Sequence, residues 1–156
     1  MGTMGSVRFD VIHRFDAPAR LVWDELVDWA GHAEWIPATR VEVAAGDPTT
    51  PGARFTAWTG IGRLALEDRM EVVSCDWDDA AGSGTCEVRK LGPVLTGTAG
   101  FTVRPEGSGA VVEWREDVVV PLVPRVLSPV VARAGAAGFR SGMKRLGKLL
   151  ARRQPA

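Results

Sequence analysis

The first segment with a regular pattern alternates apolar and polar residues, as a strand buried on one side does. In residues 7–15, one side carries Val7, Phe9, Val11, His13 and Phe15. Asp16 and Pro18 follow and are typical of a helix start, and the apolar residues after them recur at helical spacing. We therefore predict a strand over 7–15, a short helix over 17–29 and a second helical turn over 32–37.

The middle of the chain changes to a period of two residues, which indicates strands separated by turns rich in Gly, Pro and Asp. Because the turns are short, neighbouring strands should be antiparallel. The pattern predicts six strands, over residues 39–45, 53–59, 63–76, 85–91, 94–104 and 110–120.

The C-terminal segment, residues 127–152, has the two-sided pattern of a long amphipathic helix. One face carries Val131, Gly135, Gly138, Gly142, Leu146 and Leu149, and the opposite face carries Arg133, Arg140, Lys144 and Lys148. Each glycine disfavours a helix by about 1 kcal/mol relative to alanine. Two explanations remain open: the sheet approaches the helix backbone closely, or the missing side chains leave space for a ligand.

These elements predict an α+β fold in which a seven-stranded, curved antiparallel sheet wraps around the long C-terminal helix. Two short helices follow the first strand. We expect one domain over residues 7–152, with flexible ends at 1–6 and 153–156. A pocket between the sheet and the helix follows wherever the facing side chains are small.

Composition and charge exclude several classes of protein. The 156 residues carry no net charge, which argues against a dedicated nucleic-acid binder. Two cysteines cannot form a disulfide framework, and without a secretory leader a reducing cytoplasm is expected. No segment predicts a transmembrane helix. The charge is uneven, because eight Lys and Arg residues and no acid follow Asp117.

Several short motifs give the chain a resemblance to a known family. They are Phe15-Asp16-Ala17-Pro18, Val22-Trp23, Asp28-Trp29, Trp35-Ile36-Pro37, Asp68-Arg69-Met70, Arg89 to Gly97 and Trp114-Arg115-Glu116-Asp117. Over about residues 7–150 the chain resembles the bacterial polyketide cyclase/dehydratase family of the START and birch-pollen-allergen-like (SRPBCC) superfamily. The resemblance implies a helix-grip fold and a hydrophobic ligand, but a shared fold does not define the chemistry.

Three charged residues are predicted to face the interior. Strand parity places Asp68 beside Leu66 and Met70, Glu116 beside Trp114, and Lys90 on the same side as Cys86. A buried carboxylate needs a cation, a hydrogen-bond network, a raised pKa or a ligand. Asp68 and Glu116 are therefore candidates for binding or acid–base catalysis, or members of a structural ion pair. Lys90 either neutralises one acid or reaches solvent.

The remaining candidates are aromatic residues, histidines and glycines. In the fold that the resemblance implies, the first strand pairs antiparallel with the last, which would place His13 near Trp114 as a hydrogen-bonded core residue or a general base. His32 is expected to bind backbone groups. Trp35 and Trp114 are candidates to line the pocket, with Gly138 and Gly142 on the helix opposite. The chain contains no tyrosine, whereas aromatase and cyclase relatives use tyrosine hydroxyls, which weakens the inference of a cyclase.

No cofactor or metal is predicted. Gly60 to Ala65 matches G-x-G-x-x-A, but it joins two strands, whereas a dinucleotide site joins a strand to a helix. The histidines and cysteines lack the spacing of metal ligands. Parity places Cys75 outside and Cys86 inside, so we predict free thiols.

The sequence thus favours a protein that binds a small hydrophobic or amphipathic molecule, polyketide-like or lipid-like, in the pocket. One alternative is a cyclase or dehydratase that uses Asp68, Glu116 or His13. A second is a lipid carrier that contacts membranes through the basic helix face, without stable membrane insertion. No nucleic-acid partner is expected, and the monomeric or dimeric state remains open.

Overall fold

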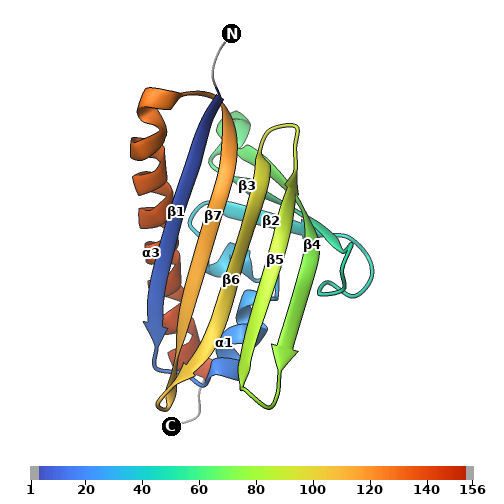
Figure 1. The fold of residues 1–156 in the computed structure, drawn as a ribbon, viewed down its shortest axis with the longest axis vertical. Helices are drawn as coiled ribbons and strands as arrows, with labels where there is room; N and C mark the ends of the chain where they lie inside the picture. The colour runs from blue at the N-terminus through green and yellow to red at the C-terminus, as the bar shows by residue number, and fades with distance from the viewer. Residues whose placement is uncertain (1–3, 154–156) are drawn as a thin grey trace.

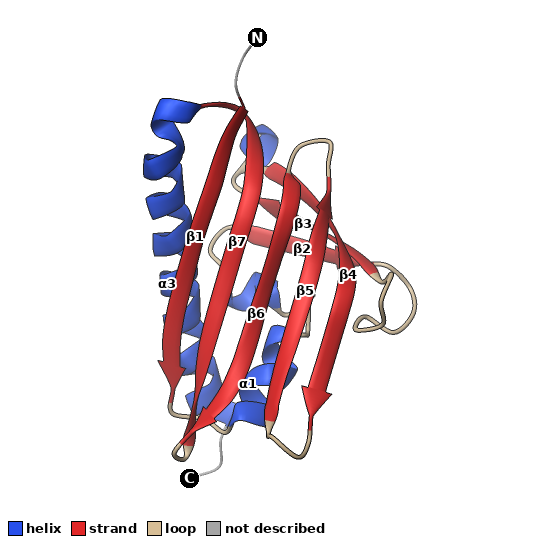
Figure 2. Ribbon diagram, in the orientation of Figure 1, coloured by secondary structure: helices blue, strands red, loops and turns tan. Residues whose placement is uncertain are grey.

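Seven antiparallel strands form one sheet, in the order β1-β7-β6-β5-β4-β3-β2, in the computed structural model, which describes residues 4–153 (Figures 1 and 2). The strands are β1 (Met4–Phe15), β2 (Thr39–Val43), β3 (Arg54–Thr59), β4 (Leu66–Asp78), β5 (Ser83–Leu91), β6 (Thr96–Glu106) and β7 (Gly109–Pro124). The helices are α1 (Ala19–Leu26), α2 (His32–Trp35) and α3 (Ser128–Arg153), with short 3₁₀ turns at Gly62–Leu64 and Arg125–Leu127.

The predicted α+β architecture is confirmed, because a long C-terminal helix packs on a seven-stranded antiparallel sheet. In Figure 1, α3 runs beside β1, and β2 and β3 turn away from the direction of the long strands. Short connections join β4 to β5, β5 to β6 and β6 to β7, which explains their antiparallel pairing. No helix among residues 4–153 is both long and apolar enough to cross a lipid bilayer.

Some element bounds differ from the sequence prediction. Strand β1 begins at Met4, and Gly5 and Ser6 pair with Val120 and Val119 of β7. Residues 4–6, which we expected to precede the domain, are therefore part of the sheet. Helix α1 ends at Leu26, three residues before the predicted end. The remaining residues of the expected flexible ends, apart from Arg153 at the end of α3, lie outside the described part of the chain.

The predicted placement of the two cysteines is wrong. Cys75 and Cys86 are direct cross-strand partners, because the β4–β5 register shifts between Val72 and Ser74. A one-residue bulge reverses which side chains share a face beyond it. A hydrogen bond between the two thiols, together with burial, raises the pKa of Cys86. The parity argument for free thiols is therefore wrong, but the prediction itself is confirmed, because both cysteines are free thiols in the structure.

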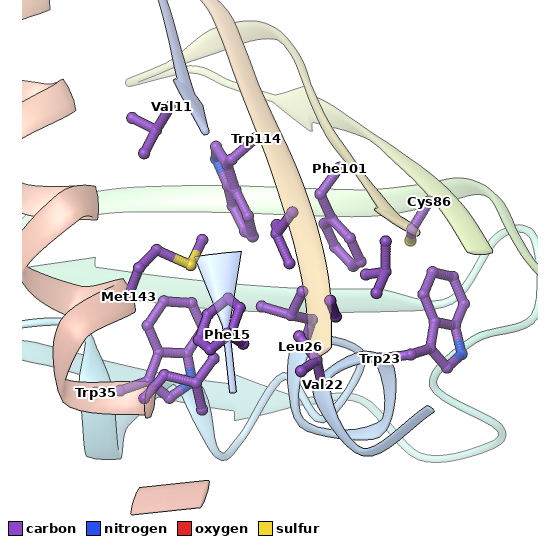
Figure 3. Close-up of a cluster of buried hydrophobic side chains, with 14 of the residues drawn as sticks. Val11, Phe15, Val22, Trp23, Leu26, Trp35, Cys86, Phe101, Trp114 and Met143 are labelled. Atoms are coloured by element: carbon purple, nitrogen blue, oxygen red, sulfur yellow. The ribbon is translucent and has the colours of Figure 1, made fainter. Parts of the chain in front are cut away.

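The hydrophobic core lies between the sheet and the three helices. In Figure 3, Trp35 and Met143 lie on the side of α3, and Trp114 and Phe101 project from the sheet. Met143 is fully buried, as are Leu146 and Leu26. Burial of side chains of this size stabilises a fold by about 1.5–3 kcal/mol each. The C-terminal half of α3 is therefore held firmly against the sheet.

Candidate ligand-binding cavity

A cavity of about 360 Å³ lies between the sheet and the N-terminal half of α3. Its lining is mainly apolar and comes from β1, α2 and the segment after it, all of the other strands, and α3. Thr59, Leu66 and Ala134 are exposed members of the lining and mark its rim. The volume lies in the range typical of small-molecule sites.

The glycines on the inner face of α3 have different surroundings, so both explanations offered from the sequence apply, at different positions. A Cβ atom at Gly142 would lie 3.2 Å from the ring of Trp35, and one at Gly135 would lie 2.7 Å from the ring of Phe9. At Gly138 a Cβ would have no neighbour within 4 Å, and this glycine lines the cavity. Gly138 is therefore placed as predicted, whereas Gly142 is a position of close packing and does not line the cavity.

The two tryptophan candidates also differ in position, since only one of them lines the cavity. Trp114 lines the cavity and is stacked on Phe101, with ring centroids 5.2 Å apart and planes inclined by 13°. Trp35 is fully buried beside Gly142 and meets Trp114 edge-on, at a centroid distance of 6.4 Å. The prediction that Trp35 lines the cavity is wrong, because its ring fills the space that Gly142 leaves in the core.

The three charged candidates come together in the cavity wall. Lys90 Nζ donates a hydrogen bond to Asp68 Oδ2 at 2.5 Å and lies 3.4 Å from Glu116 Oε2. Trp114 Nε1 donates to Glu116 Oε1 at 3.1 Å. The Lys90 and Glu116 side chains are only 4% and 8% exposed, so this is a buried network. The inward orientation predicted for all three residues is confirmed.

Small residues on β6 allow this network to span four strands. Lys90 of β5 pairs with Gly97, and Ala99 pairs with Glu116 of β7, so no large β6 side chain separates the lysine from the glutamate. Gly97 has a φ of +124°, and a Cβ there would lie 2.2 Å from the carbonyl oxygen of Asp117. This position therefore requires glycine.

Burial and the neighbouring charges act in opposite directions on the network. Burial raises the pKa of Glu116, although the Lys90 cation and the Trp114 hydrogen bond oppose the shift. For Lys90, burial alone would lower the pKa, but attraction by Glu116 and Asp68 outweighs it and raises the pKa. Lys90 is therefore charged at neutral pH. Among residues 4–153, no three His, Cys, Asp or Glu side chains gather as a metal site would require.

His13 lies apart from the cavity. It pairs with Val112, and Val11 is the residue opposite Trp114. The imidazole meets Phe15 edge-on at a centroid distance of 4.7 Å, and burial and the Lys144 charge lower its pKa. His13 is therefore not opposite Trp114, as predicted, and it does not line the cavity.

Sequence reasoning missed other lining residues. His32 binds a backbone carbonyl as expected, with Nε2 2.7 Å from the Leu26 oxygen, but it also lines the cavity. Burial lowers its pKa to about 4. Phe139, beside Gly138 on α3, and Phe9, on the apolar side of β1, also belong to the aromatic lining, as do Trp29 and Phe55. The alternation of β1 could have indicated Phe9, whereas nothing local distinguished Phe139.

The model of one protein family, described as polyketide cyclase/dehydrase and lipid transport, matches residues 6–151. The chain belongs to this family. Family membership agrees with the resemblance noted from the motifs and with the helix-grip arrangement of the sheet and α3. The sequence has no match among curated proteins.

Solved structures share the fold at low sequence identity. The Zhui aromatase/cyclase from Streptomyces sp. R1128 is 16% identical, with a TM-score of 0.69 and 97% of both chains covered. A START superfamily protein from Mycobacterium smegmatis is 15% identical, with a TM-score of 0.70, and the match covers 94% of this chain and 99% of that one. The protein Ara h 8.0201 is 14% identical, with a TM-score of 0.57 and coverage of 91% and 99%. At these identities the similarity shows the fold alone.

Proposed function

We propose that this protein binds a small hydrophobic or amphipathic molecule in the cavity between the sheet and α3. The observation that carries the proposal is the mainly apolar cavity of about 360 Å³, left open at Gly138. Apolar walls supply affinity through removal of the ligand's surface from water, and a few polar groups orient the ligand. In this wall the polar groups are concentrated at Asp68, Lys90 and Glu116.

A titration with N-phenyl-1-naphthylamine, an uncharged probe whose fluorescence rises in apolar surroundings, tests this proposal. We expect saturable binding to the folded protein that an excess of an unlabelled apolar competitor reverses. Mass spectrometry of molecules that co-purify with the native protein would then identify the natural ligand. Absence of saturable, reversible probe binding would overturn the proposal.

A second candidate is an enzyme of the cyclase or dehydratase type. The observation that favours it is Glu116, a buried carboxyl in the cavity wall whose pKa is raised by burial. A buried carboxyl whose pKa is raised holds its proton more firmly than an exposed one and can act as a general acid. If the co-purifying molecule is converted, Glu116→Gln and Asp68→Asn should abolish its conversion while leaving its binding. Unchanged conversion would exclude these residues as the acid–base pair.

Delivery of the ligand to a membrane extends the first proposal. The basic residues Arg133, Arg140 and Lys144 of α3 are exposed, and so are the apolar Val126 and Val130 near its start. Basic and apolar side chains together attract a protein to anionic lipid surfaces. Co-sedimentation with vesicles should therefore require an anionic lipid and weaken as salt rises. Sedimentation that is indifferent to both would contradict this extension.

A further inference from the structure

The hydrogen-bonding groups of the cavity wall leave one acceptor without a partner. Lys90 Nζ has three neighbours: Asp68 Oδ2, Glu116 Oε2 and, at 3.8 Å, Met70 Sδ. Glu116 Oε1 accepts the hydrogen bond from Trp114. Asp68 Oδ1 is buried and has no hydrogen-bond partner within the described part of the chain. An unpaired buried acceptor of this kind destabilises the folded protein, and a donor supplied by a ligand would remove that penalty.

The charge of the wall agrees with this hydrogen-bond pattern. Asp68, Lys90 and Glu116 are the charged side chains of the lining, since burial keeps His32 neutral at pH 7. When Glu116 is ionised, the wall carries two negative charges and one positive charge. When Glu116 is protonated, the charges balance. In neither state does the wall offer free positive charge to an anion.

The position of Lys90 reinforces this point. Its ammonium group, which could otherwise receive a ligand carboxylate, is only 4% exposed and already lies between two carboxylates. An incoming anion would have to displace Asp68 or Glu116 from the lysine and leave that carboxylate buried and unpaired. A ligand cation would in turn share Asp68 with Lys90 and lose its own hydration in a mainly apolar cavity.

We infer that the ligand is an apolar molecule that presents an uncharged hydroxyl group, alcoholic or phenolic, to the Asp68 carboxylate, which lines the cavity and turns to expose the buried Oδ1, and that carboxylate-ended molecules such as fatty acids are disfavoured. The inference rests on the proposed binding function and names the chemical class of its ligand. The hydroxyl hydrogen would satisfy the free acceptor, and the apolar body would lie against Trp114, Phe139 and Gly138.

Three naphthalenes that share one ring system and differ in a single substituent test the inference. Each displaces N-phenyl-1-naphthylamine from the native protein at neutral pH: 2-naphthol offers a donor, 2-methoxynaphthalene an acceptor alone, and 2-naphthoate a negative charge. We expect 2-naphthol to bind at least about tenfold more tightly than 2-methoxynaphthalene, because a hydrogen bond to a charged group contributes a factor of this size. We expect 2-naphthoate to bind most weakly.

Two variants connect this order of affinity to Asp68. Asp68→Asn should remove the tenfold preference or reverse it, because the amide oxygen would face Lys90 and the amide nitrogen would replace Oδ1. The control Thr39→Val removes a hydroxyl from the same lining and should keep the preference. If Asp68→Asn does not fold, the order measured with the native protein decides alone.

The outcomes separate this inference from the proposal on which it rests. Saturable binding of N-phenyl-1-naphthylamine, combined with equal displacement by 2-naphthol and 2-methoxynaphthalene, would overturn the inference and leave the binding function intact. Strongest displacement by 2-naphthoate would do the same. No probe binding at all would overturn both.

Discussion

Gly142 and Gly138, in the C-terminal and N-terminal halves of α3, face the same sheet in opposite ways. In the C-terminal half, Gly142 receives the ring of Trp35, and Met143, Leu146 and Leu150 are buried. In the N-terminal half, Gly138 faces open space and lines the cavity. One residue type thus serves close packing at one position and an empty volume one helical turn away. The difference depends on the residue opposite, an indole ring in one case and none in the other.

This contrast explains how the fold tolerates a cavity. Contacts in the C-terminal half hold α3 against the sheet, so the N-terminal half does not need to fill the space beneath it. Unfilled volume near a core has a stability cost, since the atoms around it lack packing partners. A larger side chain at Gly142 should therefore lower stability. A larger side chain at Gly138 should raise stability and weaken ligand binding.

The largest effect on stability is expected for Lys90, in the wall of the cavity. Lys90→Met removes the cation between two buried carboxylates and should lower the free energy of unfolding by about 3–5 kcal/mol at neutral pH. Because burial raises the pKa of Glu116 and protonation of this carboxyl relieves the repulsion, the loss should shrink as the pH falls. Chemical denaturation at several pH values measures both effects.

Arg89→Met is the matched control for Lys90→Met. Arg89 lies next to Lys90 on β5, but its side chain is 58% exposed, and its partner Glu71 keeps a second cation, Arg54, when Arg89 is removed. Exposed pairs contribute about 0–1 kcal/mol, so this variant should remain close to the native protein. Equal losses in the two variants would show that the buried network has no special role.

His32 lies where the cavity meets the packed core, since it lines the cavity and contacts Trp35. Its pKa is about 4 in the folded protein against 6.5 for the unperturbed group, so the unfolded chain binds the proton more readily. The stability from neutral His32 is complete above pH 6.5 and is lost as the pH falls towards 4, by about 3 kcal/mol in all.

Comparison with His32→Gln at each pH isolates this contribution from those of other groups. His13, with a lowered pKa, acts in the same direction, and Glu116, with a raised pKa, acts in the opposite one. Both are present in the variant and cancel in the difference. Parallel stability curves for the two proteins between pH 4 and 6.5 would contradict the role of His32.

Gly142, in the closely packed C-terminal half of α3, should not accept a larger side chain. Gly142→Leu would drive new atoms into Trp35 and should lower the free energy of unfolding by about 1–3 kcal/mol. The midpoint of thermal or denaturant unfolding measures the change. A variant as stable as the native protein would show that Trp35 can move aside at little cost.

The smallest effect on stability, and the opposite sign, is expected at Gly138. Gly138→Leu adds a side chain where there is space and improves helix propensity, so stability should rise by up to about 1 kcal/mol. The same side chain would occupy the cavity and weaken binding of N-phenyl-1-naphthylamine. The control Ala137→Leu, on the exposed side of α3, should leave binding unchanged. Undiminished binding by Gly138→Leu would place the ligand elsewhere.

Periodicity alone predicted the order of elements, because alternation and helical spacing record which side chains are buried. The same rule oriented Asp68, Lys90 and Glu116 inward. It failed for Cys75, since a bulge in β4 is a property of strand pairing and leaves no local mark. It also could not distinguish Gly138 from Gly142, because the difference lies in the position of Trp35, far away in the sequence.

Lys90 of the cavity wall also connects strands of the sheet that are not neighbours. From β5 it holds a carboxylate of the adjacent β4 and, over the small residues of β6, another on β7. Three strands, β4, β5 and β7, therefore share one ionic network on the side of the sheet that faces the cavity. A molecule bound against Lys90 therefore lies beside a network that joins three strands of the sheet through a single side chain.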